Sequence, residues 1–296
     1  MASVGPLESW LLSYDFVMDA PGSWSASQAG AFCACVMAAL AFLNNIVPPV
    51  ARALLRGAPP IPAQGSHLDA LEWKDHLFLF INRLASIPFT YHFVVTAWTL
   101  PSIVWCVRGG GGAGAGRGAW RELPFPHSTA TRLPEQATLS NTLLAVPVLF
   151  VLYDLFYSLF HRALHIKSVY SLVHKHHHRQ HAPSRGAVDA LNVHPFEFVC
   201  GEYNHLLALW LTQRLLGSVH VAAVLFFIVA GGAAASLNHT RLDVRLPLGT
   251  YAVRAHDVHH RLPRSNYGQY TQVWDRLLGT YREWNPPTGK ADGKAQ

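Results

Sequence analysis

Charged residues are scarce in this sequence. Asp, Glu, Lys and Arg make up 14% of its 296 residues, whereas soluble domains average about 25%. Half of the residues are apolar, and the mean hydropathy is positive. Because these apolar residues gather in long runs, the composition favours an integral membrane protein over a soluble domain.

Cysteine is also rare, and its placement excludes two common scaffolds. Cys33, Cys35, Cys106 and Cys200 form no Cys-x-x-Cys pair and lie in apolar sequence. A disulfide framework or a zinc ribbon is therefore not expected, and we expect a reducing, cytosol-facing setting. The first residues, MASVGPLESWLL, lack the basic region of a cleavable signal peptide, so none is expected.

The net charge of +6 does not indicate a nucleic-acid partner. Lys and Arg flank the apolar runs instead of forming a polar stripe, which fits a membrane surface better. Many of these basic residues fall in 162–185 and 241–264, and the positive-inside tendency places those segments in the cytosol.

Four apolar regions are long enough to span or enter a bilayer. They are residues 29–49, 76–107, 140–160 and 203–237. Pro88 and Pro101 interrupt the second region, which is compatible with one kinked span or a re-entrant pair. Gly217 interrupts the last, which is compatible with one long span or a helical hairpin. The glycine-rich segment 108–118 is predicted to be a flexible linker, since it lacks the Lys-Ser/Thr ending of a phosphate-binding loop.

Histidine is abundant, with 18 residues, and most of them cluster. On a helix, positions i, i+3 and i+4 share one face, so each cluster can direct two or three imidazoles at one point. Neutral imidazole is a common ligand for iron, copper, zinc and nickel. The clusters are His161 with His165; His174 with His177 and His178; and His256 with His259 and His260.

Asp154 precedes the first cluster on the same helical stripe. It lies seven residues before His161, which is about two helical turns. An acid and two histidines on an otherwise apolar helix are costly in lipid and usually face an interior site. We therefore predict that Asp154 orients a ligand imidazole.

Several kinds of metal protein could use these clusters. A zincin protease needs His-Glu-x-x-His, and the Glu is missing between His161 and His165. Soluble carboxylate di-iron bundles need two Glu-x-x-His motifs, and only Glu202 with His205 matches. A histidine-rich metal transport or storage protein remains an alternative. Eight histidines suit two metals, and two irons could each supply an electron to O₂ for attack on an unactivated C–H bond.

The three clusters and the residues around them occur in an order that resembles the fatty acid hydroxylase / sterol desaturase superfamily. The resemblance covers about 140–285. The matching residues are Asp154 before His161-Arg162, His194-Pro195-Phe196-Glu197, His256-Asp257-Val258-His259-His260, Asn266-Tyr267-Gly268, Trp274-Asp275-Arg276 and Gly279-Thr280.

The resemblance implies an all-α integral membrane protein, with about four transmembrane helices under a cytosolic helical cap that holds a histidine-ligated di-metal centre. It implies a di-iron oxygenase that hydroxylates or desaturates a sterol or fatty-acyl lipid with O₂. Electrons would come from NAD(P)H through a cytochrome b5-type carrier and its reductase. Because the sequence has no His-Pro-Gly-Gly haem signature, we expect a separate donor. We expect an endoplasmic reticulum location with the metal centre facing the cytosol.

Carried onto this chain, the resemblance implies a set of metal ligands. His239 joins the three clusters. The family often has a further polar ligand four positions earlier, where this chain has Ala235, and His194 or Asn238 could take the place of that ligand. Tyr267 could hydrogen-bond a ligand. We expect His176 to be solvent-facing or behind a ligand and His205 to be structural. The implied ligands are His161, His165, His174, His177, His178, His239, His256, His259 and His260.

The chain accordingly divides into three parts. Residues 1–139 are expected to be an N-terminal membrane region with loops, and residues 140–285 a fatty acid hydroxylase-like catalytic domain. Residues 286–296 are expected to be a disordered C-terminal tail.

Overall fold

The computed structural model describes residues 21–55, 60–63, 68, 70–100, 102–104, 137–247 and 250–285. The predicted linker 108–118 and tail 286–296 lie outside these residues, as does Cys106. The described chain is mostly helical. Its longer α-helices are α2 (Ala26–Asn45), α3 (Val47–Leu54), α4 (Trp73–Thr99), α5 (Ala145–Leu164), α8 (Pro195–Leu216), α9 (Val221–Leu237) and α10 (Val253–Arg261).

Short elements connect these helices. A π-helical turn, η3 (Leu139–Leu144), leads into α5, and a two-residue parallel pair joins β1 (Ile103–Val104) to β2 (Val219–His220). The remaining short helices are η2 (Pro21–Ser23), α6 (Lys167–Tyr170), η4 (His177–Arg179), α7 (Ala187–Leu191) and α11 (Val273–Leu277).

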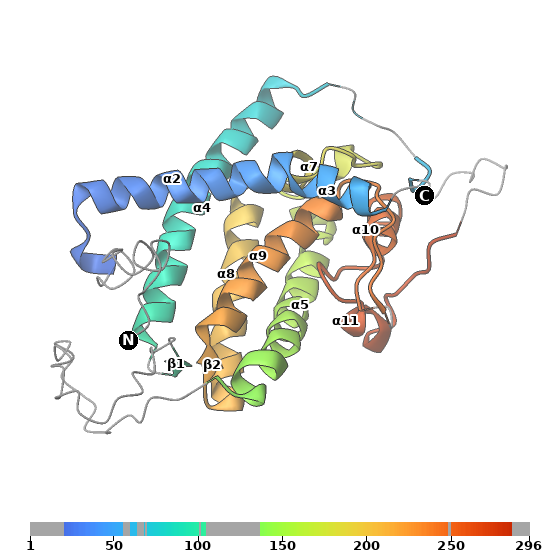
Figure 1. Cartoon of the computed structure of the whole chain (residues 1–296). Helices are drawn as coiled ribbons and strands as arrows, with labels where there is room; N and C mark the ends of the chain where they lie inside the picture. The colour runs from blue at the N-terminus through green and yellow to red at the C-terminus, as the bar shows by residue number, and fades with distance from the viewer. Residues whose placement is uncertain are drawn as a thin grey trace, which may run out of the picture.

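Helices α4, α5, α8 and α9 form a bundle, and α2 runs across it (Figure 1). The bundle core is aromatic and aliphatic, with Phe89 and Phe93 from α4, Leu149 from α5, Leu209 from α8 and Phe227 from α9. Burial of these side chains supplies the main packing energy between the helices. The bundle therefore provides a rigid support for the segments at its ends.

The region 203–237 is a helical hairpin. Helix α8 ends at Leu216, and the next residue, Gly217, has a φ of 79°, in the left-handed region that glycine adopts at low cost. Helix α9 begins four residues later at Val221. Of the two alternatives that the sequence allowed, the structure has the hairpin.

Helix α4 runs unbroken through Pro88 to Thr99, so the described residues of 76–107 form a single helix followed by β1. Asn82 is fully buried on this helix, and its amide donates to the carbonyls of Leu191 and Val193, each at 2.9 Å. Because a buried amide is costly unless it is hydrogen-bonded, this contact fixes α4 against the segment between α7 and α8.

Among the described residues, three helical segments are long and apolar enough to cross a membrane: Ala26–Leu54, Trp73–Thr99 and Leu139–Leu164. Large apolar side chains point away from the bundle, as Phe80 (61% exposed) and Leu225 (61% exposed) do. Such outward-facing side chains suit contact with lipid. The prediction of an all-helical membrane protein is confirmed, with three candidate spans where we expected about four.

The histidine clusters lie at the ends of the long helices and in the short segments that follow them. His161 and His165 close α5, η4 follows shortly after, and α10 comes after α9. Helix α11 packs beside α5, where the Trp274 indole donates to the Val151 carbonyl at 2.7 Å (Figure 1). The histidine-bearing segments are thereby anchored to the bundle.

Candidate metal centre

All nine histidines predicted as ligands converge in two groups. In each group, one ring nitrogen per residue lies within 4.8 Å of one nitrogen of every other member. We call them the five-histidine group and the four-histidine group. The first contains His161, His165, His174, His178 and His259; the second contains His177, His239, His256 and His260.

Each His-x-x-His-His motif divides between the two groups, although we expected each cluster to converge on one point. On α10, His256 and His260 enter the four-histidine group, whereas His259 enters the five-histidine group. Adjacent residues on an α-helix diverge by about 100°, so His259 and His260 cannot share a target, whereas positions four apart nearly coincide. Each motif therefore connects both groups.

The imidazoles approach one another through Nε2. In the five-histidine group, the Nε2 atom of His174 lies 3.0 Å from those of His161 and His178. In the four-histidine group, the Nε2 atom of His256 lies 3.1 Å from those of His239 and His260. The Nε2 atoms are thus turned toward the middle of each group.

The opposite ring nitrogen, Nδ1, is held by acceptors in five of these imidazoles. A carbonyl or carboxylate oxygen only accepts, so Nδ1 carries the proton and Nε2 carries the lone pair. The acceptors are the Tyr267 carbonyl for His161 (2.9 Å), the Glu197 carboxylate for His174 (2.8 Å), the Ser265 carbonyl for His259 (2.7 Å), the Ala235 carbonyl for His239 (2.9 Å) and the Gln180 carbonyl for His260 (2.8 Å).

This arrangement fits a bound cation in each group. The Nε2 lone pairs of His161 and His174 face each other at 3.0 Å, which is repulsive unless a positive charge lies between them. The Nε2 atom of His165 is buried with no hydrogen-bond partner among the described residues. Burial lowers the pKa of His178 to about 3 and holds that of His259 well below its usual value, so both rings stay neutral. Neutral nitrogen donors suit iron, copper, zinc or nickel and not magnesium or calcium.

Glu197 is a residue of this centre to which the sequence assigned no role. It lies in the first turn of α8 and is buried, and its Oε1 atom accepts the Nδ1–H of His174 at 2.8 Å. A carboxylate behind a ligand imidazole fixes its tautomer and raises its basicity. The only sequence signal was its place in the matching segment His194–Glu197, since the contact spans 23 residues.

Asp154 reaches the centre indirectly, whereas we expected it to contact an imidazole. Its carboxylate accepts the backbone N–H groups of Gln269 and Tyr270, at 3.0 and 3.1 Å, and that of Thr271. The same loop carries the Tyr267 carbonyl that holds His161. Asp154 therefore fixes a backbone loop that in turn orients a ligand.

Asp275 holds the other end of this loop. Its carboxylate accepts the N–H groups of Tyr267 and Gly268 at 2.8 and 2.9 Å. A Cβ atom on Gly268 would lie 2.4 Å from the Thr271 carbonyl oxygen, so the tight loop leaves no room for a side chain there.

Three further predicted residues lie beside the two groups and not within them. His194 caps α8, its Nδ1 accepting the Phe196 N–H at 3.2 Å. The Asn238 amide donates to the Gln269 carbonyl at 2.7 Å. The Tyr267 ring packs 5.5 Å from the His165 ring.

His176 lies behind the ligand-bearing turn. Its Nε2 contacts Asp75 Oδ1 at 2.9 Å, which joins the turn to α4. His181 is in neither group.

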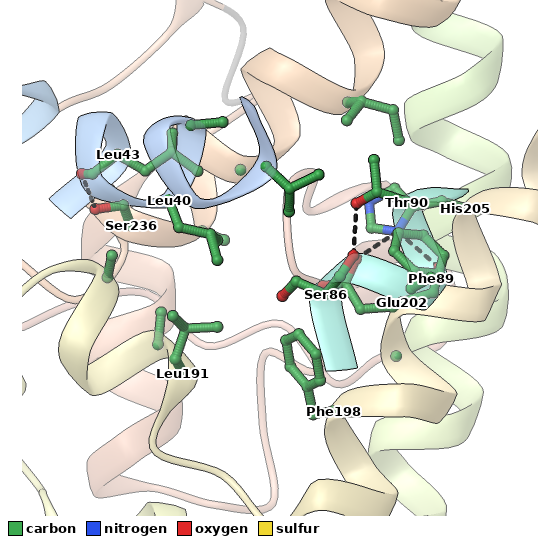
Figure 2. A pocket seen from close by; sticks show the side chains of 18 of the residues that line it. Leu40, Leu43, Ser86, Phe89, Thr90, Leu191, Phe198, Glu202, His205 and Ser236 are labelled. Atoms are coloured by element: carbon green, nitrogen blue, oxygen red, sulfur yellow. Dashed lines mark hydrogen bonds and ion pairs between the residues drawn. The ribbon is translucent and has the colours of Figure 1, made fainter. Parts of the chain in front are cut away.

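A cavity of about 400 Å³ lies between the bundle and α2, mostly lined by apolar side chains (Figure 2). Its lining includes Glu197 and Ala235, which accept hydrogen bonds from His174 and His239. It also includes Tyr157, whose ring packs 5.2 Å from that of His161. The cavity thus reaches both groups through these lining residues, although none of the nine ligand histidines lines it. Its volume is in the range of small-molecule sites.

Similarity to known proteins covers the part of the chain that carries these histidines. The sequence model described as "Fatty acid hydroxylase" matches residues 146–280. A Delta(7)-sterol 5(6)-desaturase of Leptosphaeria maculans is 30% identical over 51% of this chain and 40% of its own length. Methylsterol monooxygenase 1 of Rattus norvegicus is 32% identical over 47% of each chain.

A further relative is the cholesterol 25-hydroxylase-like protein 1, member 2, of Danio rerio. It is 29% identical over 56% of this chain and 58% of its own length. The chain thus spans about half the length of these curated relatives. No solved structure matches the chain.

Proposed function

Because residues 146–280 belong to the fatty acid hydroxylase family, we propose that this chain is a membrane-bound oxygenase that hydroxylates or desaturates a lipid. The observation that carries the proposal is the pair of all-histidine groups, one residue layer away from a mostly apolar cavity. The names of the relatives, a sterol desaturase and a methylsterol monooxygenase, support a sterol or similar lipid as substrate.

Two iron ions are the proposed cofactor, one in each histidine group. When bound, such a pair supplies the electron transfer that activates O₂ for attack on a C–H bond, which side chains cannot supply. The nine histidines hold the ions through neutral nitrogens. Electrons would come from NAD(P)H through a separate cytochrome b5-type protein and its reductase.

The chain itself supplies position and a dry environment. Glu197 and the carbonyls behind five of the imidazoles hold their Nε2 atoms toward the middle of each group. The cavity would hold the lipid with one carbon at the end lined by Glu197 and Tyr157, which contact the histidine groups, and its apolar walls exclude water. The position of that carbon decides the product. Loss of a second hydrogen yields an alkene, and addition of oxygen yields an alcohol.

The same arrangement supports a location. Seven of the nine histidines lie within the basic segments 162–185 and 241–264, which favour the cytosolic side of a membrane. Together with the sterol-related names of the relatives, this supports an endoplasmic reticulum membrane with the centre facing the cytosol.

The proposal is tested by lipid profiling of cells that produce the parent chain or a variant. His177→Ala and His259→Ala each remove one ligand from a different group, and both should abolish the new lipid product while membrane insertion persists. His76→Ala is the matched control, since His76 is exposed on α4. Undiminished product from either ligand variant would contradict the proposal. A metal transport or storage protein would bind metal without O₂ consumption dependent on NAD(P)H.

A further inference from the structure

The cavity contains a polar cluster that the histidine centre does not use. Glu202 and His205 on α8 line it together with Tyr270. Figure 2 shows Glu202 and His205 on the same side as Ser86 and Thr90 of α4, with Leu40, Leu43, Leu191 and Ser236 on the other side. Most of the polar residues labelled there thus gather on one side of the cavity, where they can hydrogen-bond a ligand.

His205 and Tyr270 already have partners that fix their roles. The Nδ1–H of His205 donates to the Glu202 backbone carbonyl at 2.9 Å. The Tyr270 hydroxyl donates to His205 Nε2 at 3.3 Å. Aromatic rings surround this pair, with Tyr153 and Phe227 at 4.3 and 5.2 Å from the imidazole. The pair is rigid, and the phenolic oxygen of Tyr270 retains a lone pair.

The Glu202 carboxyl, in contrast, lacks a close partner. Among the described residues, its one polar contact is His205 Nδ1 at 3.7 Å, and that proton is already given to a carbonyl. The side chain is 30% exposed and lines the cavity. An acid in the middle of a largely apolar helix is costly and calls for a functional partner.

The charge of the lining decides which partner is suitable. The lining residues include two carboxyl groups, Glu197 and Glu202, and the described lining contains no Lys or Arg. A free carboxylate or phosphate on a ligand would find no cation there and would be repelled by an ionised glutamate. A neutral hydroxyl can donate to Glu202 and accept from a neighbouring group, so it suits the cluster in either protonation state.

We propose that Glu202 binds a neutral hydroxyl group on the lipid and thereby selects hydroxylated lipids over acidic ones. This inference rests on the proposed function and names the substrate class. Glu202 lies five residues beyond Glu197 on α8, roughly 7.5 Å along the axis. The hydroxyl end of the ligand is therefore held away from the histidine end, where the reacting carbon lies.

The test is equilibrium binding to the purified full chain in lipid nanodiscs, without reductant. Two probe series are used: cholesterol, its 3-methyl ether, its hemisuccinate and its 3-amino analogue; and hexadecanol with the matching ether, acid and amine. In at least one series the alcohol should bind at least about tenfold tighter than the ether, because a hydrogen bond to a charged group contributes about that much. In the same series the alcohol should also bind tighter than the acid.

Variants assign this preference to Glu202. Glu202→Leu should remove the preference for the alcohol and leave ether affinity unchanged. Glu202→Gln keeps a hydrogen-bonding group and should retain a preference of about two- to tenfold, which decides the matter if the leucine variant fails to fold. Glu283→Gln, at an exposed position, is the matched control and should behave as the parent.

Several results would overturn the inference. These are equal binding of alcohol and ether in both series, tighter binding of an acid or amine than of the alcohol, or no saturable binding at all. A full alcohol preference in Glu202→Gln and in a folded Glu202→Leu would also overturn it. Because binding is measured without turnover, a chain that binds hydroxyl lipids but lacks iron would contradict only the proposed function.

Discussion

Replacing Glu197 should weaken metal binding in one histidine group and spare the other. Glu197 accepts the Nδ1–H of His174 at 2.8 Å, and both side chains are buried. In Glu197→Leu the imidazole loses the partner that sets its tautomer and orientation. His174 belongs to the five-histidine group, whereas the four-histidine group has no contact with Glu197 among the described residues.

The size of the effect follows from the role of this contact. Removing a carboxylate behind a ligand imidazole costs roughly 10- to 100-fold in metal affinity, which is about 1.4 to 2.7 kcal/mol. Glu197→Gln should cost less, because its amide oxygen can still accept the Nδ1–H. A neutral acceptor contributes about half as much as a charged one.

The assay is anaerobic titration of the metal-free chain with Fe²⁺ against a competing chelator. We expect two sites in the parent, and one unchanged and one weakened site in Glu197→Leu. Glu283→Gln controls for loss of an acidic residue at an exposed position. Unchanged affinity at both sites in a folded Glu197→Leu would refute the reasoning, and so would equal weakening of both.

Three other perturbations test the supports of the centre. Asp154→Ala leaves three backbone N–H groups without their acceptor, so the free energy of unfolding should fall by at least about 2 kcal/mol. An unchanged thermal midpoint of unfolding would show that the loop does not depend on this carboxylate. Gly268→Ala places a Cβ atom against the Thr271 carbonyl oxygen, whereas a Cβ atom on Gly30 would have nothing within 4 Å. Gly268→Ala should therefore lower the thermal midpoint of unfolding, and the control Gly30→Ala should not. Equal effects of the two substitutions would count against a tight loop. Burial lowers the pKa of His178 to about 3, below the 6.5 of an unfolded imidazole. Because the unfolded chain then binds more protons than the folded one, the metal-free protein should lose stability as the pH falls from 7 to 5. A thermal midpoint of unfolding that does not change over that interval would contradict the burial of neutral rings.

The spacing of histidines is a local property, so the sequence alone predicts eight of the nine converging histidines, and the family resemblance adds His239. Positions 256, 259 and 260 project from one helix whatever surrounds it, and the apolar runs flanking the clusters indicate a membrane bundle. The division of each motif between two groups was missed. It depends on how α10 and the turn at 174–178 face each other, which is a matter of tertiary packing.

The supports of the centre were less accessible from sequence. The acceptors of several Nδ1 protons are backbone carbonyls, such as those of Gln180 and Ser265, and any residue type provides a carbonyl. The partners of Asp154 lie 115 to 117 residues away. Glu202 and His205 match a Glu-x-x-His motif, but only the packing of neighbouring helices shows that they line a cavity.

The most direct test of the account is the metal content of the chain purified from cells supplied with iron. Elemental analysis should give about two irons per chain for the parent. The double variant His256→Ala/His260→Ala, which removes two members of the four-histidine group, should give about one. A parent chain without iron, or a double variant that retains the full parental content, would contradict the claim that the two histidine groups each hold one iron.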